Sequence, residues 1–108
     1  MADTVLVVDD DSNIREVLHK FFTLKGYQVV LAADGEQALE LAKCEMPKAI
    51  FLDIKMPGID GMETCKRLRA NEKTRLIPII LITAYGSSKT EANDAGVDDI
   101  IYKPFDMR

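Results

Sequence analysis

Short apolar runs rich in Val and Ile alternate along this chain with longer stretches whose apolar residues recur at helical spacing. The runs cover residues 5–8, 27–31, 49–52, 79–82 and 97–102. Such strands are typical of a parallel sheet that is buried on both faces, with the helical stretches as crossovers between them. The alternation therefore predicts an α/β domain with five parallel strands.

The first helical stretch follows residue 11, where Asp11 or Ser12 could cap it, and ends at Gly26. Its apolar residues at helical spacing, which we expect to face the sheet, are Ile14, Val17, Leu18, Phe21 and Leu24. The next stretch begins at Asp34, places Gln37 where a capping box requires it, and stops before Pro47. It should bury Ala38, Leu39 and Ala42.

A third helix is expected after Asp60 and Gly61. We expect it to bury Met62, Cys65 and Leu68 and to turn Lys66, Arg67 and Arg69 toward water. The fourth stretch, residues 87–95, has only two alanines as apolar residues, so a short or mobile helix is predicted there.

The length of 108 residues, 47% of them hydrophobic, suits one core, so we expect a single domain over residues 1–108. The net charge of -4 disfavours a nucleic-acid partner or an anionic membrane. The amino-terminal apolar run is too short for a signal peptide or a membrane span, which predicts a cytoplasmic protein. Cys44 and Cys65 form no CxxC motif, so we expect two partly buried thiols, neither in a disulfide nor on a metal.

Reactive side chains follow four of the five predicted strands. The strand ends carry Asp9, Asp10 and Asp11, then Asp53, then Thr83, and finally Lys103. Right-handed crossovers bring the carboxyl ends of parallel strands to one edge of the sheet, where ligands bind in open α/β folds. This edge is the predicted functional site.

Each of these residues also has an ordinary structural interpretation. Asp9 to Asp11 could be helix caps, Thr83 could be a β-forming residue, and Lys103 could be a solvated charge. Asp53 is harder to explain in this way, because it ends a strongly apolar strand.

Taken together, the acids make a physical demand. Carboxylates that converge within about 4 to 6 Å repel one another by several kcal/mol per pair, so such a cluster needs a cation. An all-oxygen set of ligands favours Mg²⁺. A metal-neutralised site could receive a phosphate, with one carboxylate as nucleophile and Lys103 and Thr83 as donors to the phosphoryl oxygens.

Four segments in this order resemble the receiver domain of two-component response regulators. They are residues 7–11 (VVDDD), 52–61 (LDIKMPGIDG), 82–84 (ITA) and 103–105 (KPF), and the resemblance covers nearly the whole chain. It implies a flavodoxin-like, doubly wound sheet with the strand order 2-1-3-4-5. It also implies a phosphoacceptor domain that catalyses only its own phosphorylation and dephosphorylation. Its partners would be a histidine kinase or a histidine phosphotransfer protein and an effector domain or downstream protein.

The resemblance implies a role for each matching residue. Asp53 would be the phosphoacceptor, Asp9, Asp10, Asp53 and the backbone carbonyl of Lys55 would hold Mg²⁺, and Lys103 and Thr83 would bind the phosphoryl group. The side chains of Lys55 and Tyr85 would tune the lifetime of the acyl phosphate, and the Lys103–Pro104 bond would be cis. His19 is expected at the surface.

The chain also departs from the family pattern. Ile100 stands at the switch position, where an aromatic residue is usual, and the segment between Thr83 and Lys103 looks about two residues short. Because the chain stops at Arg108, we expect the fifth helix of such a domain to be missing or truncated.

Two other functions stay open at this point. A Mg²⁺-dependent phosphatase-like hydrolase of the haloacid dehalogenase type also uses an aspartate nucleophile after its first strand, but its lysine precedes a later acidic pair, whereas Lys103 follows Asp98 and Asp99. A receiver-like interaction module that is no longer phosphorylated is the second alternative.

Overall fold

The computed structural model describes residues 3–84 and 96–103 of the chain, which form five strands and three helices. In chain order these are β1 (Thr4–Val8), α1 (Ser12–Leu24), β2 (Gln28–Ala32), α2 (Gly35–Glu45), β3 (Ala49–Asp53), α3 (Gly61–Ala70), β4 (Ile79–Ala84) and β5 (Asp99–Lys103). The predicted strands shift by at most two residues at either end. The helix predicted at residues 87–95 and the Lys103–Pro104 bond lie outside the described residues.

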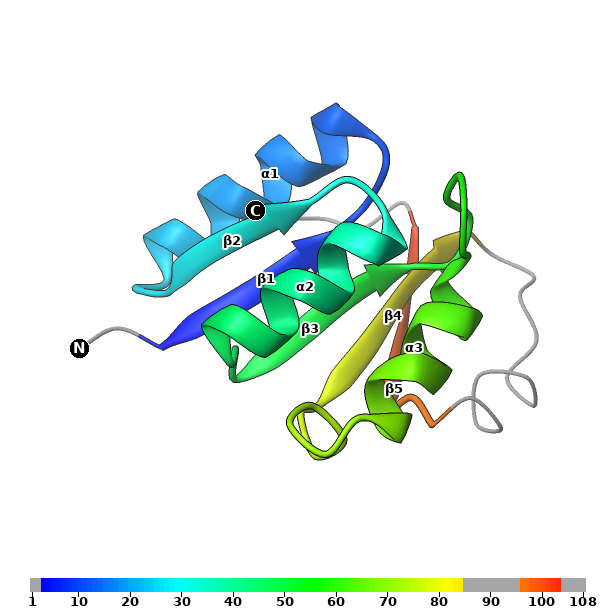
Figure 1. Ribbon diagram of the computed structural model, residues 1–108. Coiled ribbons are helices and arrows are strands. Elements are labelled where there is room, and N and C mark those ends of the chain that lie inside the picture. Colours follow the sequence, from blue (N-terminus) through cyan, green and yellow to red (C-terminus); the bar gives the residue numbers. More distant parts are fainter. Residues whose placement is uncertain (1–2, 85–95, 104–108) are drawn as a thin grey trace.

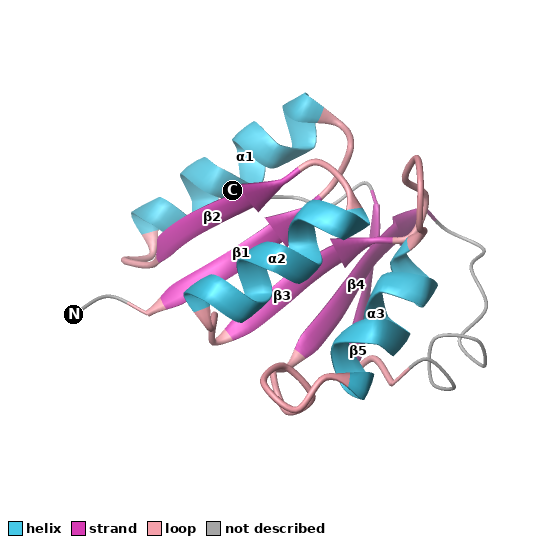
Figure 2. Cartoon of the chain, in the orientation of Figure 1, coloured by secondary structure: helices cyan, strands magenta, loops and turns pink. Residues whose placement is uncertain are grey.

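All five strands are parallel and lie in the order β2-β1-β3-β4-β5. This confirms the predicted doubly wound α/β fold. Helices α2 and α3 cover one face of the sheet and α1 covers the other (Figure 1). The three helices all begin beside the carboxyl ends of the strands (Figure 2).

Alternate residues of the buried strands supply two separate apolar clusters. The larger cluster joins Leu6, Val8, Ile50, Leu52, Ile79 and Leu81 to residues of α2 and α3 that include Ala38, Ala42, Cys65 and Leu68. The smaller cluster, on the other face, joins Val7 and Ile82 to Leu18 of α1. Because successive strand residues point to opposite faces, one apolar run serves both clusters.

An aspartate caps each of the three helices: Asp34 as predicted, Asp11 out of the two candidates Asp11 and Ser12, and Asp60 at the expected start of the third helix. Asp11 accepts a hydrogen bond from the backbone N–H of Asn13, Asp34 from that of Gln37, and Asp60 from that of Glu63. The Gln37 side chain closes a variant of the capping box, because it accepts from the N–H of Ala33 and not from that of the cap residue. The caps fix where each loop of the carboxyl edge ends.

The inward face of α1 is narrower than predicted. Ile14, Leu18 and Phe22 contact the sheet, and the ring of Phe22 lies 4.6 Å from that of Phe51 between centroids. Val17 is 42% exposed and Leu24 is 87% exposed, so their expected burial is wrong. A helix that lies on a sheet buries one stripe of residues four apart, and these two residues fall beside it.

Arg69 does not face water, contrary to the prediction. Only 22% of its side chain is exposed. Its guanidinium donates hydrogen bonds to the backbone carbonyls of Gly96, Arg75 and Ile77 and pairs with the Asp98 carboxylate at 2.8 Å. The end of α3 lies over the turn into β4 and the entry to β5, where these carbonyls need donors.

One of the two cysteines also differs from the expectation. Cys65 is buried, as predicted, but Cys44 is exposed on α2 and not partly buried. His19 is exposed, as predicted. Within the described ranges, every helix is too short or too polar to serve as a membrane span.

Candidate metal and phosphoacceptor site

Asp9, Asp10 and Asp53 meet at the carboxyl edge of the sheet. Each offers a carboxylate oxygen, and these oxygens all lie within 4.8 Å of one another. Asp9 is fully buried and Asp53 is 6% exposed, whereas Asp10 is exposed to solvent. The cluster predicted from the sequence therefore exists, with two of its acids inside the protein and one at its surface.

Strand register brings the two buried acids together. Val8 of β1 pairs with Leu52 of β3, so the residue after each, Asp9 and Asp53, arrives at the same level of adjacent strands. The backbone N–H of Asp9 still donates to the carbonyl of Ala32 at 3.1 Å, which extends the ladder to β2 by one residue. The sheet itself thus holds both carboxylates in place.

The turn between β1 and α1 is ordered around Asp9. The N–H of Asp11 donates to Oδ1 of Asp9 at 2.9 Å, and the Asp11 side chain caps α1. The guanidinium of Arg15 donates to the backbone carbonyl of Asp9 at 2.7 Å. Arg15 was not among the site residues predicted from the sequence.

The loop after β3 folds tightly back onto Asp53. The N–H of Gly61 donates to the carbonyl of Ile54 at 2.7 Å, and a Cβ added to Gly61 would lie 2.2 Å from the Asp53 carbonyl oxygen. Only glycine allows this approach. Lys55, whose carbonyl is the predicted metal ligand, is exposed within this loop.

The start of α2 supports the same loop from the side. A Cβ added to Gly35 would lie 2.3 Å from Oγ1 of Thr64 and 2.5 Å from a side-chain carbon of Ile59. The Thr64 hydroxyl donates to the carbonyl of Asp60 at 2.7 Å, and Thr64 is fully buried. In the sequence, the signal was a glycine directly after two of the three capping aspartates, Asp34 and Asp60, where alanine would suit a helix better.

The other predicted site residues are placed less completely. Thr83 and Lys103 lie in the last residues of β4 and β5, where Thr83 pairs with Tyr102 and Lys103 with Ala84, so the backbone of both reaches the same edge. Ile100 is half-buried against the larger apolar cluster. Tyr85 lies outside the described residues.

The cluster suits a hard divalent cation. Among the described residues it contains carboxylates alone, while Cys65 lies in the apolar cluster under α3 and His19 is exposed on α1. The spacing of the oxygens allows one or two of them to bind an ion directly and the rest through water, which is how Mg²⁺ is usually held. The repulsion between the two buried carboxylates also favours cation binding, because a bound cation relieves it.

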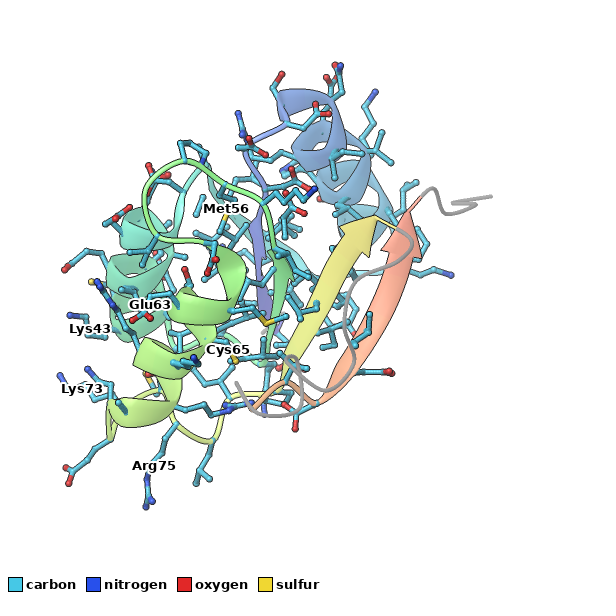
Figure 3. The ribbon with its side chains drawn as sticks, turned by 90° about the vertical axis from the view of Figure 1, so that its right-hand side faces the viewer. Lys43, Met56, Glu63, Cys65, Lys73 and Arg75 are labelled. Carbon is cyan, nitrogen blue, oxygen red and sulfur yellow. The ribbon has the colours of Figure 1, made fainter. Side chains whose placement is uncertain are left out.

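Two exposed basic side chains, Lys73 and Arg75, lie at the opposite end of the sheet. In Figure 3, Met56 marks the loop at the carboxyl edge, and Lys73 and Arg75 lie at the other end, beyond α3. Cys65 lies between the two ends, under α3, and Lys43 and Glu63 lie on the outer side of the helices.

Comparisons of the sequence agree with this geometry. The family described as "response regulator receiver domain" matches residues 5–108. Response regulator MprA of Mycolicibacterium vanbaalenii is 43% identical over 107 residues, which cover 97% of this chain and 46% of that protein. MprA of Mycobacterium tuberculosis is 41% identical over the same shares of the two chains. The chain thus spans about half the length of the curated relatives it matches.

Solved structures of similar fold lead to the same group. Chemotaxis protein CheY4 of Vibrio cholerae has a TM-score of 0.94 at 32% identity, covering 99% of this chain and 91% of that one. The receiver domain of sensor histidine kinase PA1611 of Pseudomonas aeruginosa has a TM-score of 0.90 at 32% identity, covering 99% and 89%. That second structure is described with a magnesium ion coordinated in its active-site cleft.

Proposed function

This chain belongs to the family of response regulator receiver domains, and from that premise we propose that it receives a phosphoryl group on Asp53. The donor would be a phosphohistidine of a histidine kinase or of a histidine phosphotransfer protein, and the exchange would take place in the cytoplasm. The domain would catalyse only its own phosphorylation and dephosphorylation, with no separate substrate to turn over. Its output would pass to an effector domain or to a downstream protein.

The observation that carries this proposal is the meeting of Asp9, Asp10 and Asp53 at the adjoining ends of β1 and β3. Asp53 is nearly buried but ends its strand at the edge where ligands bind in folds of this class. Carboxylates gathered this closely repel one another, and a bound cation would offset that repulsion. The alternative hydrolase is disfavoured by the family match, and the non-phosphorylated module by the intact acidic cluster.

Asp9, Asp10, Asp53 and the carbonyl of Lys55 are the proposed ligands of Mg²⁺. When bound, the ion would neutralise charge on the phosphoryl oxygens during transfer. The tight turn from Ile54 to Gly61 supports the role of Lys55, because it holds the intervening loop against the end of β3.

In the proposed transfer, a carboxylate oxygen of Asp53 attacks phosphorus, the bond from phosphorus to the histidine nitrogen breaks, and the leaving imidazole takes a proton from solvent. Lys103 would offset charge on the phosphoryl oxygens, and the Thr83 hydroxyl would donate a hydrogen bond to them. Their backbone positions at the ends of β5 and β4 support these roles. The Lys55 and Tyr85 side chains would set how fast water reaches the acyl phosphate.

Phosphorylation would then bias two states of the loops that follow β3 and β4. New contacts of Thr83 and Lys103 would favour one of the states. Ile100 occupies the switch position on β5, so the signal would pass by packing of an aliphatic side chain in place of the usual aromatic one.

Incubation with a small phosphodonor and Mg²⁺ tests the proposal. We expect a labile mass increase of one phosphoryl group, which disappears when Mg²⁺ is chelated. Asp53→Asn should abolish it. The matched control is Asp60→Asn, which alters an acid of the same loop but keeps a good helix cap and should accept the group normally.

Two results would count against a receiver function. An equal mass increase in Asp53→Asn would place the phosphoryl group elsewhere. Repeated turnover of a generic phosphate ester, without a stable phosphorylated protein, would favour the hydrolase.

A further inference from the structure

We propose that Arg15 is a positioning residue for the metal site, acting through the backbone of Asp9. The inference rests on the proposed function, since it concerns how the same acidic cluster is prepared for Mg²⁺. Arg15 belongs to α1 and carries a positive charge, so it is not itself a ligand. Its side chain is in direct contact with the acidic turn.

The contact is short and specific. Nη1 of Arg15 lies 2.7 Å from the carbonyl oxygen of Asp9, and the bond is partly buried. The backbone of Arg15 is held in the first turn of α1, where its N–H donates to the carbonyl of the cap residue Asp11 at 3.1 Å. The helix therefore fixes the point from which the side chain reaches the carbonyl of Asp9.

With Arg15 in place, Asp9 is restrained on every side that the backbone offers. Its N–H donates to Ala32, its carbonyl accepts from Arg15, and its Oδ1 accepts from the N–H of Asp11. The peptide that links Asp9 to Asp10 is thus fixed in orientation. Asp10 itself is exposed, so the orientation of this peptide sets the direction in which the Asp10 side chain leaves the backbone.

The positive charge has a second effect, opposite in sign for metal binding. The guanidinium at the carbonyl of Asp9 is a positive charge at the acidic turn, which reduces the repulsion among the carboxylates before any ion arrives and also repels the ion. A purely electrostatic role would make Mg²⁺ bind more tightly when the charge is removed. A positioning role predicts weaker binding, because outer groups that orient metal ligands typically contribute about 10-fold to 100-fold in affinity. The two roles are therefore separable by the sign of one measurement.

The test is the Mg²⁺ dissociation constant of the full chain, measured by titration calorimetry for Arg15→Gln and Arg15→Lys. We expect Arg15→Gln to bind Mg²⁺ about 10-fold more weakly than the wild type, and Arg15→Lys to fall between the two because it keeps a donor and the charge. Phosphoryl uptake from a small donor should fall at low Mg²⁺ and recover at saturating Mg²⁺. Lys20→Gln, an exposed cation on the same helix paired with Glu16, is the control and should bind normally.

Unchanged or tighter Mg²⁺ binding in Arg15→Gln, with wild-type protein binding normally, would overturn the inference and leave the proposed function standing. If the wild-type chain neither bound Mg²⁺ nor took up a phosphoryl group, the proposed function itself would fail. If Arg15→Gln does not fold, Arg15→Lys decides: wild-type affinity in that variant would also overturn the inference.

Discussion

The two ends of the sheet use charge in opposite ways. At the carboxyl edge, strand register brings Asp9 and Asp53 together inside the protein beside the exposed Asp10. At the amino edge, Arg69 finds three backbone carbonyls and the carboxylate of Asp98. One end gathers charges of like sign, and the other matches opposite charges and donors to acceptors.

The contrast separates the part of the molecule that holds the fold from the part that responds. A partly buried arginine with several acceptors stabilises the fold, because its removal leaves those acceptors without hydrogen bonds and lowers the free energy of unfolding. Crowded carboxylates instead destabilise the folded state by their mutual repulsion. A bound cation reduces that repulsion and so stabilises the fold. We therefore expect removal of a charged side chain at the amino edge to affect stability and removal of one at the carboxyl edge to affect the response to Mg²⁺.

The largest effect should come from Arg69→Ala. Loss of the guanidinium removes a donor from three backbone carbonyls and breaks the ion pair with Asp98, which keeps its hydrogen bond from the N–H of Ile79, so the free energy of unfolding should fall by about 3 kcal/mol. Urea unfolding measures it, and the loss should be the same with and without Mg²⁺. Arg67→Ala removes an exposed pair with Glu63 from the same helix and should cost about 0.5 kcal/mol or less. A loss of similar size in both variants would contradict the contrast.

The next effect compares one glycine from each edge. Gly61→Ala would place a methyl group against the carbonyl of Asp53 and should cost about 2 to 3 kcal/mol, because the obstacle is backbone. Gly26, between α1 and β2, has φ of +93° but nothing within 4 Å of an added Cβ. Gly26→Ala should therefore cost only the strain of a left-handed residue, about 1 kcal/mol. Thermal unfolding measures both losses. A larger loss of stability in Gly26→Ala than in Gly61→Ala would contradict this interpretation.

The free energy of unfolding should also depend on pH through Cys65, which lies near Arg69 and Asp98 of the amino edge. Burial raises the pKa of the Cys65 thiol from 9.0 to about 11, while nearby Arg69 lowers it and Asp98 raises it. The folded state favours the neutral thiol, so this contribution to stability is complete below pH 9 and is lost as the pH rises toward 11. Between pH 8 and pH 11 the wild type should lose on the order of 2 kcal/mol more than Cys65→Ala. Parallel pH profiles of unfolding would contradict this.

The smallest expected effect is at the carboxyl edge. Mg²⁺ at ten times its dissociation constant should stabilise the wild type by about 1.4 kcal/mol, and Asp10→Ala should show little of this gain. Without Mg²⁺, Asp10→Ala should be the more stable protein by about 1 kcal/mol, because one of three like charges is gone. Asp34→Asn, which keeps its helix cap, should respond to Mg²⁺ as the wild type does. An equal gain in Asp10→Ala would count against the metal assignment.

Much of the fold could be predicted because it depends on local patterns. Apolar runs gave the five strands, and the capping aspartates Asp11, Asp34 and Asp60 marked the three helix starts. The meeting of Asp9 and Asp53 followed from two predictions together: parallel strand ends share an edge of the sheet, and the strand order implied by the family resemblance makes the first and third strands neighbours.

The failures concern contacts between elements distant in sequence. Arg69 looks like any surface arginine of an amphipathic helix until Gly96 and Asp98 are placed beside it. Leu24 was placed on the buried side of its helix, but it lies beside the stripe of residues that contacts the sheet and is 87% exposed. Arg15 was missed for a related reason: its partner is a backbone carbonyl, which carries no signal in the sequence.

Adjacent parallel strands are separated by about 4.8 Å, a distance set by the hydrogen bonds of the peptide backbone. Two acids that end neighbouring strands at the same level inherit this interval whatever the rest of the sequence does. Evolution could then vary helices, loops and partners freely without disturbing the dimensions of the ion site. Lengthening one acid, as in Asp→Glu, would disturb those dimensions at once, so we expect the chain length of these side chains to be among the least variable properties of such domains.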